Sequence, residues 1–197
     1  MSVNLFTPDE QGHIILVKAF LRNLSKACPV LSSQMILAGG RIAREIQKVE
    51  SGEPLVLDDA DTDVFVLCPT NVEYVTSFDE FTRWTIGQSK GSKSTRTRFI
   101  YKNLYSNIIN KHIRQVVEDT DTNIQYIFTD YPDRKALIDD FDFEHCCASY
   151  DINKDELYIT RKILDCIVKK NLIARIDPAS WRTEKFKSLG YRHQNTD

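Results

Sequence analysis

The chain lacks several features that would place it in a specialised class of proteins. No stretch approaches the roughly 18 consecutive apolar residues needed to cross a bilayer, and no basic region followed by a long apolar run opens the sequence. The five cysteines are odd in number and show no C-x-x-C spacing, which argues against a disulfide framework. We therefore expect an intracellular, cytoplasmic protein with buried thiols and no membrane partner.

There is also no excess of charge of one sign. The 197 residues include 26 Lys and Arg against 28 Asp and Glu, a formal net charge of -2. This total does not mark the whole chain as a nucleic-acid-binding protein. Hydrophobic residues make up 42% and charged residues 27%, which is ordinary for a globular chain and excludes disorder. At this length we expect one main domain with a small appendage.

Helical and strand-like segments alternate along the chain. Apolar spacing predicts a first helix that ends near Leu24, capped by Thr7 or Asp9, and a last helix that opens at Asp177 and ends at Gly190. Between them we expect helices over residues 41–49, 78–84, 108–117, 134–140 and 161–170. Strands are expected over residues 34–38, 61–68, 123–129, 141–150 and 157–160, and the last two form a hairpin. Residues 99–104 fit either a strand or the start of a helix.

The sharpest chemical signal is Asp61-Thr62-Asp63 at the start of a predicted strand. Side chains alternate across a strand, so Asp61 and Asp63 share one face. Two neighbouring carboxylates repel each other unless a cation lies between them, and Mg²⁺ suits such a pair because it prefers hard oxygen ligands and substrate phosphates. Taken alone, the motif is equally typical of an acidic, solvated turn.

Two further features bear on this motif. Gly39-Gly40 stands at the head of a predicted helix, where backbone N–H groups can approach a phosphate, although a plain tight turn would look the same. Asp142 lies between Phe141 and Phe143 in an apolar segment, where an unpaired carboxylate is expensive to bury. A third acid facing the same metal, or an ordinary salt bridge, would each explain Asp142.

Together these residues resemble the signature of the polymerase-beta-type nucleotidyltransferase superfamily. The matching parts are Leu37-Ala38-Gly39-Gly40, Asp61-Thr62-Asp63 followed by an apolar strand, and Asp142 as the third acid. The C-terminal segment is similar to the tail of small stand-alone members in phages and large viruses. The resemblance implies an α+β nucleotidyltransferase fold, with a mixed β-sheet flanked by helices and with C-terminal helices. Twenty residues separate Gly40 from Asp61, more than is usual in the superfamily, so a loop must follow the helix.

The resemblance also implies a reaction. Asp61, Asp63 and Asp142 would be the catalytic and metal-binding residues, with two Mg²⁺ ions, or Mn²⁺ in their place. A hydroxyl acceptor, for which an RNA 3′ end is one candidate, would attack the α-phosphate of a nucleoside triphosphate such as ATP, and pyrophosphate would leave. Gly39, Gly40 and Arg41 would contact the phosphates.

A basic and aromatic segment is the other candidate binding surface. Residues 83–114 contain no Asp or Glu, and aromatic residues alternate there with Lys and Arg. Such a segment is typical of a surface that binds phosphates and stacks bases, and equally of a solvated face over core aromatics. The nucleotide-binding candidates are Lys90, Lys93, Arg96 and Arg98 in this segment, with Arg182 and Lys185 on the last helix.

We expect a catalytic domain over residues 1–160 and a helical extension over residues 161–197 that packs on it. The leading hypothesis is a Mg²⁺-dependent nucleotidyltransferase. The alternatives are a catalytically inactive module of the same fold that binds nucleic acid or protein, and a toxin-like enzyme that modifies tRNA or a protein. Fold analogy does not choose among these acceptors.

Overall fold

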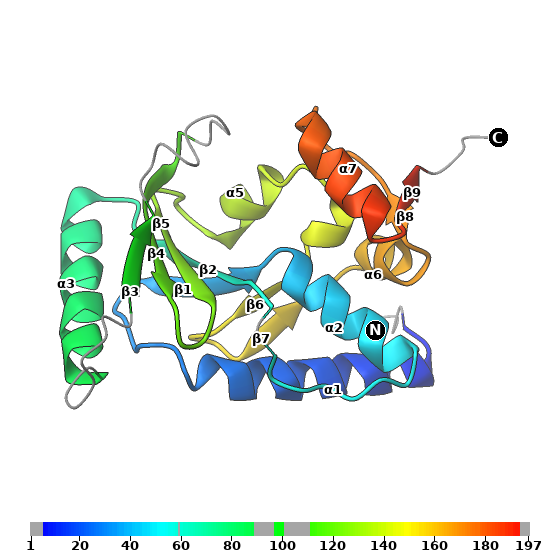
Figure 1. Cartoon of the computed structure of the whole chain (residues 1–197), viewed down its shortest axis with the longest axis horizontal. Helices are drawn as coiled ribbons and strands as arrows, with labels where there is room; N and C mark the ends of the chain where they lie inside the picture. Colours follow the sequence, from blue (N-terminus) through cyan, green and yellow to red (C-terminus); the bar gives the residue numbers. More distant parts are fainter. Residues whose placement is uncertain (1–5, 59, 89–96, 101–110, 194–197) are drawn as a thin grey trace, which may run out of the picture.

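The computed structural model of the chain describes residues 6–58, 60–88, 97–100 and 111–193. Its centre is a mixed sheet with the strand order β3-β4-β5-β2-β1-β6-β7. The strands are β1 (Gln34–Ala38), β2 (Thr62–Leu67), β3 (Thr97–Ile100), β4 (Ile113–Asp119), β5 (Ile124–Thr129), β6 (Ser149–Asp151) and β7 (Glu156–Tyr158). β5 runs parallel to β2, and every other neighbouring pair of this sheet is antiparallel. With the helices that flank the sheet, this arrangement confirms the expected α+β class (Figure 1).

The first helix, α1 (Pro8–Ser25), begins where the sequence predicts. The Thr7 hydroxyl accepts a hydrogen bond from the Glu10 backbone N–H at 3.3 Å, and the Glu10 carboxylate accepts one from the Thr7 N–H at 2.7 Å. This reciprocal capping box satisfies two N–H groups that the first helical turn leaves without partners. Val17, Leu21 and Leu24 then recur on one face of α1 and are buried in the core.

The two faces of the sheet are covered differently. The long helix α3 (Asn71–Gln88) packs Phe81 against Tyr126 and Phe128 of β5, with ring centroids 4.9 Å and 5.7 Å apart. Val64 and Val66 of β2 are fully buried on the same face, whereas Asp63 and Phe65 point to the other face and are only partly buried. The partly open face carries the polar side chains described below.

The helix α2 (Gly40–Glu50) follows β1 directly, and α5 (Arg134–Asp139) follows β5. A one-turn 3₁₀ helix, η1 (Glu144–Cys146), precedes β6, and α6 (Arg161–Val168) follows β7. The C-terminal part contains β8 (Asn171–Leu172), α7 (Ser180–Ser188) and β9 (Arg192–His193). Ile163, Leu164 and Ile167 of α6 belong to the main core, while α7 lies above α2 in Figure 1.

A second, smaller apolar cluster holds α7 in place. It contains Phe143, Cys146, Leu172, Phe186 and Tyr191, all of them buried. The Tyr191 hydroxyl accepts a hydrogen bond from the Gln47 side chain of α2 at 2.9 Å. The last helix is therefore fixed both to α2 and to the segment around η1.

Three predictions of secondary structure were wrong. Residues 108–117 were expected to be helical, but Ile113–Asp119 form the strand β4 because they pair with both β3 and β5. Residues 141–150 were expected to form one strand, but only the last two belong to β6, and η1 interrupts the segment. The last helix was expected to open at Asp177, but α7 begins at Ser180.

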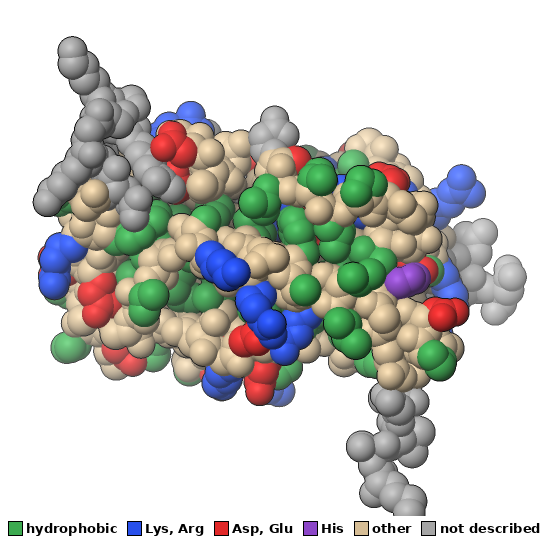
Figure 2. Space-filling view, turned by 90° about the horizontal axis from the view of Figure 1, so that it is seen from below, with side chains coloured by type: hydrophobic (Ala, Val, Ile, Leu, Met, Phe, Trp, Pro, Cys, Tyr) green, Lys and Arg blue, Asp and Glu red, His purple; other side chains and the backbone are tan. Residues whose placement is uncertain are grey.

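The face formed by α1 carries mixed charges. Figure 2 shows Lys and Arg side chains next to Asp and Glu side chains in the middle of this face, with hydrophobic side chains around them. Lys18 and Arg22 of α1 both pair with Asp155 in the β6–β7 turn. A polyanion would find no continuous positive surface there. Within the described residues, no helix is long and apolar enough to span a membrane.

Candidate active site

The turn from β1 into α2 brings backbone close to a carboxylate. Gly39 has a φ of 94°, a conformation that side-chain-bearing residues rarely adopt, and it occupies the N-cap position of α2. A Cβ at Gly39 would lie 3.4 Å from Oδ2 of Asp63, whereas a Cβ at Gly40 would meet nothing within 4 Å. The backbone angle therefore favours glycine at residue 39, where Asp63 lies in van der Waals reach of a Cβ, and residue 40 begins the helix.

Asp63 stands beside this turn because of the strand register. It pairs with Ala38, the last residue of β1, and Asp61 lies two residues earlier and is exposed. The pKa of Asp63 is raised to about 6, first by burial and then by the negative charge of Asp61. The two carboxylates predicted from the Asp-x-Asp motif thus interact, at the edge of the sheet where α2 begins.

Two cations from the C-terminal helix approach the same carboxylate. Lys185 and Arg182 of α7 both act to lower the pKa of Asp63, against the effect of burial. The two residues are three apart on the helix and share a face, as the sequence predicts. The last helix thus supplies positive charge to a site whose acids lie more than a hundred residues earlier in the chain.

Asp142 is already engaged by one of these cations. Arg182 donates from Nη2 to Oδ1 of Asp142 at 2.9 Å and from Nε to Oδ2. Asp142 lies in the bend between α5 and η1, so the expectation that it stands on a strand was wrong. Of the two explanations left open by the sequence for this acid, the structure shows the salt bridge.

The side chains next to Asp63 on the sheet were not predicted from the sequence. Asp63 is in register with Gln125 of β5, Gln125 with Glu118 of β4, and Glu118 with Arg98 of β3. Residues in register on neighbouring strands point to the same face, so these side chains form one polar row. Arg98 binds Glu118 at 2.5 Å, which places this predicted nucleotide-binding residue in an ion pair. The residue next to Asp63 on the parallel strand is an amide rather than a third carboxylate.

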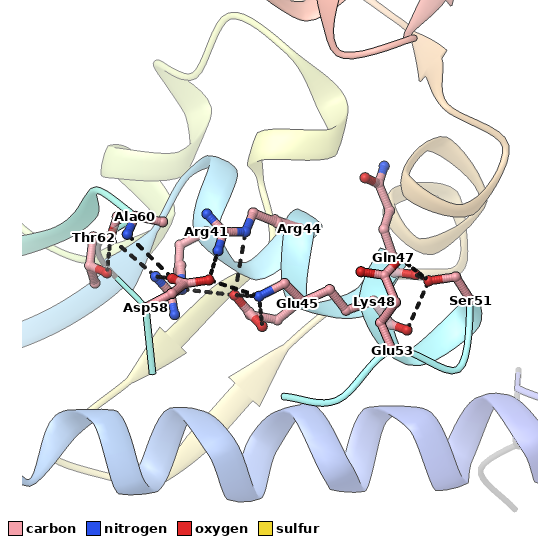
Figure 3. Close-up of polar contacts among 10 residues, drawn as sticks. All are labelled: Arg41, Arg44, Glu45, Gln47, Lys48, Ser51, Glu53, Asp58, Ala60 and Thr62. Atoms are coloured by element: carbon pink, nitrogen blue, oxygen red, sulfur yellow. Dashed lines mark hydrogen bonds and ion pairs between the residues drawn. The ribbon is translucent and has the colours of Figure 1, made fainter. Parts of the chain in front are cut away.

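The Arg41 side chain is buried and directed at Asp58, Ala60 and Glu45 (Figure 3). Its Nη1 donates to Asp58 Oδ1 at 2.9 Å and to the Ala60 carbonyl at 3.1 Å, and its Nε lies 3.0 Å from Glu45. Only 1% of the Arg41 side chain is exposed. The sequence predicts Arg41 at the phosphates, but in the structure it ties the loop before Asp61 to α2.

The rest of this charge cluster also converges on Asp58. Lys48 donates to Asp58 Oδ2 at 3.0 Å, and Arg44 binds the same oxygen, as the dashed lines in Figure 3 show. One carboxylate therefore holds three cations of one helix. Twenty residues separate Gly40 from Asp61, and the loop that this spacing requires after α2 is held to the helix through Asp58.

The remaining predicted binding residues, Lys90, Lys93 and Arg96, lie outside the described residues. The residues that are described fit a magnesium site of few protein ligands. Asp61 and Asp63 offer hard oxygens, and burial together with the charge of Asp61 raises the pKa of Asp63, so a cation beside the pair would favour its charged form. In the described part of the chain, no three His, Cys, Asp or Glu side chains group as metal ligands, so a bound cation would take its other ligands from water or substrate.

A sequence profile decides the family. The profile of the Gabija anti-defense 2 family matches residues 14–170, which is most of the chain. The protein belongs to this family. A comparison with curated proteins gave no match.

Solved structures place the Gabija anti-defense 2 chain in a known fold. The apo form I of a CCA-adding enzyme matches with a TM-score of 0.50 and 12% identity over 94% of this chain and 40% of that one. The Thermotoga maritima CCA-adding enzyme, complexed with tRNA, matches with a TM-score of 0.52 and 11% identity over 98% of this chain and 41% of that one. The chain therefore has a nucleotidyltransferase-like fold and spans about two fifths of the length of these enzymes.

Proposed function

We propose that this anti-defense protein is a Mg²⁺-dependent nucleotidyltransferase that moves a nucleoside monophosphate from a nucleoside triphosphate to a hydroxyl acceptor. The observation that carries the proposal is the convergence of Asp61 and Asp63 with the Gly39 turn and with Arg182 and Lys185 of α7. Acids for a divalent cation, a glycine turn open to phosphate and cations opposite them are the parts that phosphoryl transfer needs. They come together from three separate segments of the chain.

We assign a separate role to each residue of the site. Asp61 and Asp63 would hold Mg²⁺, which when bound supplies charge neutralisation for the triphosphate and the leaving pyrophosphate. The backbone at Gly39 and Gly40 would bind the β- and γ-phosphates, and Lys185 with Arg182 would neutralise the opposite side. The acceptor hydroxyl would release its proton to solvent as its oxygen forms the new bond to the α-phosphorus, the bond from that phosphorus to the bridging oxygen would break, and pyrophosphate would leave.

The structure modifies the role we propose for Asp142. Because both of its oxygens bind Arg182, we assign Asp142 to positioning that guanidinium at the site, and reserve metal binding for Asp61 and Asp63. Gln125 extends the polar row away from the metal pair and would face the acceptor. An RNA 3′ end remains the first acceptor to test, since the fold occurs in an enzyme complexed with tRNA.

The test is incubation of the full chain with each labelled nucleoside triphosphate, Mg²⁺ and total RNA or protein from a host that carries the Gabija defence. We expect one macromolecule to become labelled, and Asp61→Asn and Asp63→Asn to abolish the label while the proteins stay folded. Asp79→Asn is the matched control because Asp79 is an exposed acid on α3, paired with Arg83. Persistent transfer in both site variants would refute the proposal.

One observation favours a second candidate, a catalytically inactive binding module of the same fold. Arg182 binds both carboxylate oxygens of Asp142, so this acid is not free to bind a metal ion. Gln125 of β5 lies next to Asp63, where a further acid would complete the set of metal ligands. This second function predicts that the wild type transfers no nucleotide to any acceptor and that Gabija components still co-purify with it. Lys185→Gln should then weaken that association.

A further inference from the structure

A cavity of about 390 Å³ lies between α5, η1, β7 and α6, away from the acids described above. Four aliphatic side chains form part of its wall: Ile138, Leu157, Ile159 and Ile163. Arg134 and Arg175 line it as well. The other lining residues are Glu144, Cys147, Tyr158 and Thr160, so the wall is divided between apolar and polar groups. A concave site of this size with both kinds of group is typical of small-ligand pockets.

Arg134 is held in a fixed position without a counter-ion. Its Cζ lies 3.8 Å from the centroid of the Tyr158 ring, and its Nη1 donates to Ser149 Oγ at 3.3 Å. Among the described residues no carboxylate pairs with Arg134. The preceding Asp133 is used as the N-cap of α5, where it accepts from the Ala136 N–H at 2.8 Å. The guanidinium therefore keeps free donors on a stacked, rigid support, as anion-binding arginines do.

The second arginine is already neutralised. Arg175 binds the Ile138 carbonyl, and its Nη1 lies 3.0 Å from Cys147 Sγ. Glu144 and Asp139 lie 3.8 Å and 3.5 Å from its guanidinium. Glu144 in turn binds Lys162 at 2.8 Å. The charge left uncompensated in the cavity is therefore that of Arg134, and the natural ligand carries a compact anion next to an apolar body.

The cavity lies on the same face of the sheet as Asp63. Tyr158 is in register with Ser149, Ser149 with Ala38, and Ala38 with Asp63. Ser149 is two strands from Asp63, a separation of about 10 Å. A phosphate group bound by Arg134 would therefore lie on the same face of the sheet as the site proposed for nucleotidyl transfer, but separated from its acids by at least two strands.

We propose that this cavity binds the phosphomonoester of a nucleotide, with the phosphate on Arg134 and the nucleoside against the aliphatic wall. Two sources carry this chemistry, a free nucleoside monophosphate and the phosphorylated end of an RNA. The guanidinium fork matches phosphate oxygens in pairs, and the aliphatic wall adds the apolar contact that inorganic phosphate cannot make. The site needs neither Mg²⁺ nor the acids at Asp61 and Asp63.

The experiment is calorimetric titration of the full chain in EDTA with AMP, GMP, CMP and UMP, with adenosine and inorganic phosphate as partial ligands. A 5′-phosphorylated oligoribonucleotide and its unphosphorylated form are titrated in the same way. We expect saturable binding that weakens at least tenfold when the phosphate or the nucleoside is removed. Binding of the monophosphates identifies a free nucleotide as the ligand, and binding confined to the phosphorylated RNA identifies an RNA end.

Variants locate the site. Arg134→Gln should weaken binding at least tenfold, and Arg134→Lys should restore part of it because it keeps the charge but not the fork. Lys135→Gln is the matched control, since Lys135 is the next residue on α5 and 80% exposed. Thermal denaturation verifies that each variant folds. No saturable binding of any monophosphate or phosphorylated RNA, or equal affinity of Arg134→Gln and wild type, would overturn the proposal.

Asp63→Asn separates this inference from the proposed transfer reaction. The variant should bind the phosphomonoester with unchanged affinity although it transfers nothing. Loss of binding in Asp63→Asn would place the ligand at the acids and overturn the assignment to the cavity. If the wild type binds the phosphomonoester but transfers no nucleotide, the proposed transferase activity is refuted and the assignment of the cavity stands.

Discussion

Arg182 binds both carboxylate oxygens of Asp142, and this pair connects the last helix to the bend before η1. The side chains are 30% and 13% exposed, so neither is fully solvated. Arg182 also lies close enough to Asp63 to lower its pKa. Asp142 thus fixes the direction in which a cation of α7 meets the site, and the position of α7 matters for the chemistry.

The first prediction concerns this pair. Asp142→Asn leaves Arg182 partly buried without a carboxylate, and we expect the free energy of unfolding to fall by about 1–2 kcal/mol. Arg182→Gln should cost a similar amount, and the double variant less than the sum of the two, because both remove one interaction. Urea denaturation of the four proteins measures this cycle. Additive losses would show that the two residues do not act as a pair.

The second prediction compares the adjacent glycines. Gly39→Ala forces a side chain into a backbone conformation with φ of 94° and against Asp63, so we expect a loss of about 1–3 kcal/mol in unfolding free energy. Gly40→Ala should be neutral or stabilise by up to about 1 kcal/mol, because residue 40 is helical and has open space around it. Thermal and urea denaturation test both. Equal losses in the two variants would contradict the geometry.

The first helix and the β6–β7 hairpin were predicted correctly because each has its own local signals. The α+β fold class was also correct, but it followed from the resemblance to nucleotidyltransferases and not from local patterns. A buried strand, a glycine pair, a helix and an Asp-x-Asp strand lie within residues 34–67, and the antiparallel pairing of β1 with β2 places Asp63 opposite Ala38, next to the glycine turn. The roles of Asp61 and Asp63 in metal binding stay predictions.

What the sequence could not provide depends on pairing over long distances. β4 has apolar spacing that also suits a helix, and only its place between β3 and β5 makes it a strand. Gln125 and Glu118 reach the row of Asp63 through strand register, which no single segment encodes. Asp142 and Arg182 are forty residues apart, and only the packing of Phe186 and Tyr191 brings them together.

The third prediction follows from the raised pKa of Asp63. Its pKa is about 6 in the folded protein against an ordinary value of 3.8 for an aspartate, so between these pH values the folded state binds the proton more strongly. Stability of the metal-free protein is therefore lost as pH rises through this window. At pH 7, in EDTA, Asp63→Asn should be more stable than wild type by about 1–3 kcal/mol, since the variant has no charge to bury.

Denaturation at several pH values tests this. The advantage of Asp63→Asn should shrink at pH 5, where the wild-type carboxyl is largely protonated. Adding Mg²⁺ at pH 7 should stabilise wild type more than the variant. Asp79→Asn, which removes an exposed acid, should show neither effect. An advantage that stays constant from pH 7 to pH 5 would contradict the assigned pKa shift.

The last prediction concerns His145, which is fully buried among the rings of Phe143, Phe186 and Tyr191. Neither ring nitrogen has a hydrogen-bond partner among the residues that the structure describes. Burial lowers the pKa of His145 to about 4, the charge of Asp142 raises it and the charge of Arg182 lowers it further. Between pH 6.5 and pH 4 the unfolded chain therefore binds more protons than the folded one, and stability is lost as pH falls through this window.

His145→Phe should remove this acid sensitivity, because a phenyl ring fills the aromatic cluster and cannot be protonated. We expect it to match or exceed wild type at pH 7, since two unsatisfied buried nitrogens disappear, and to gain up to about 3 kcal/mol relative to wild type by pH 4. His193→Phe is the control, because His193 is exposed in β9 and its replacement should leave the pH profile unchanged. Urea denaturation from pH 7 to pH 4 measures the differences between each variant and wild type, in which the opposite contribution of Asp63 cancels. If His145→Phe follows the wild-type profile, the docking of α7 does not depend on a neutral histidine at this position.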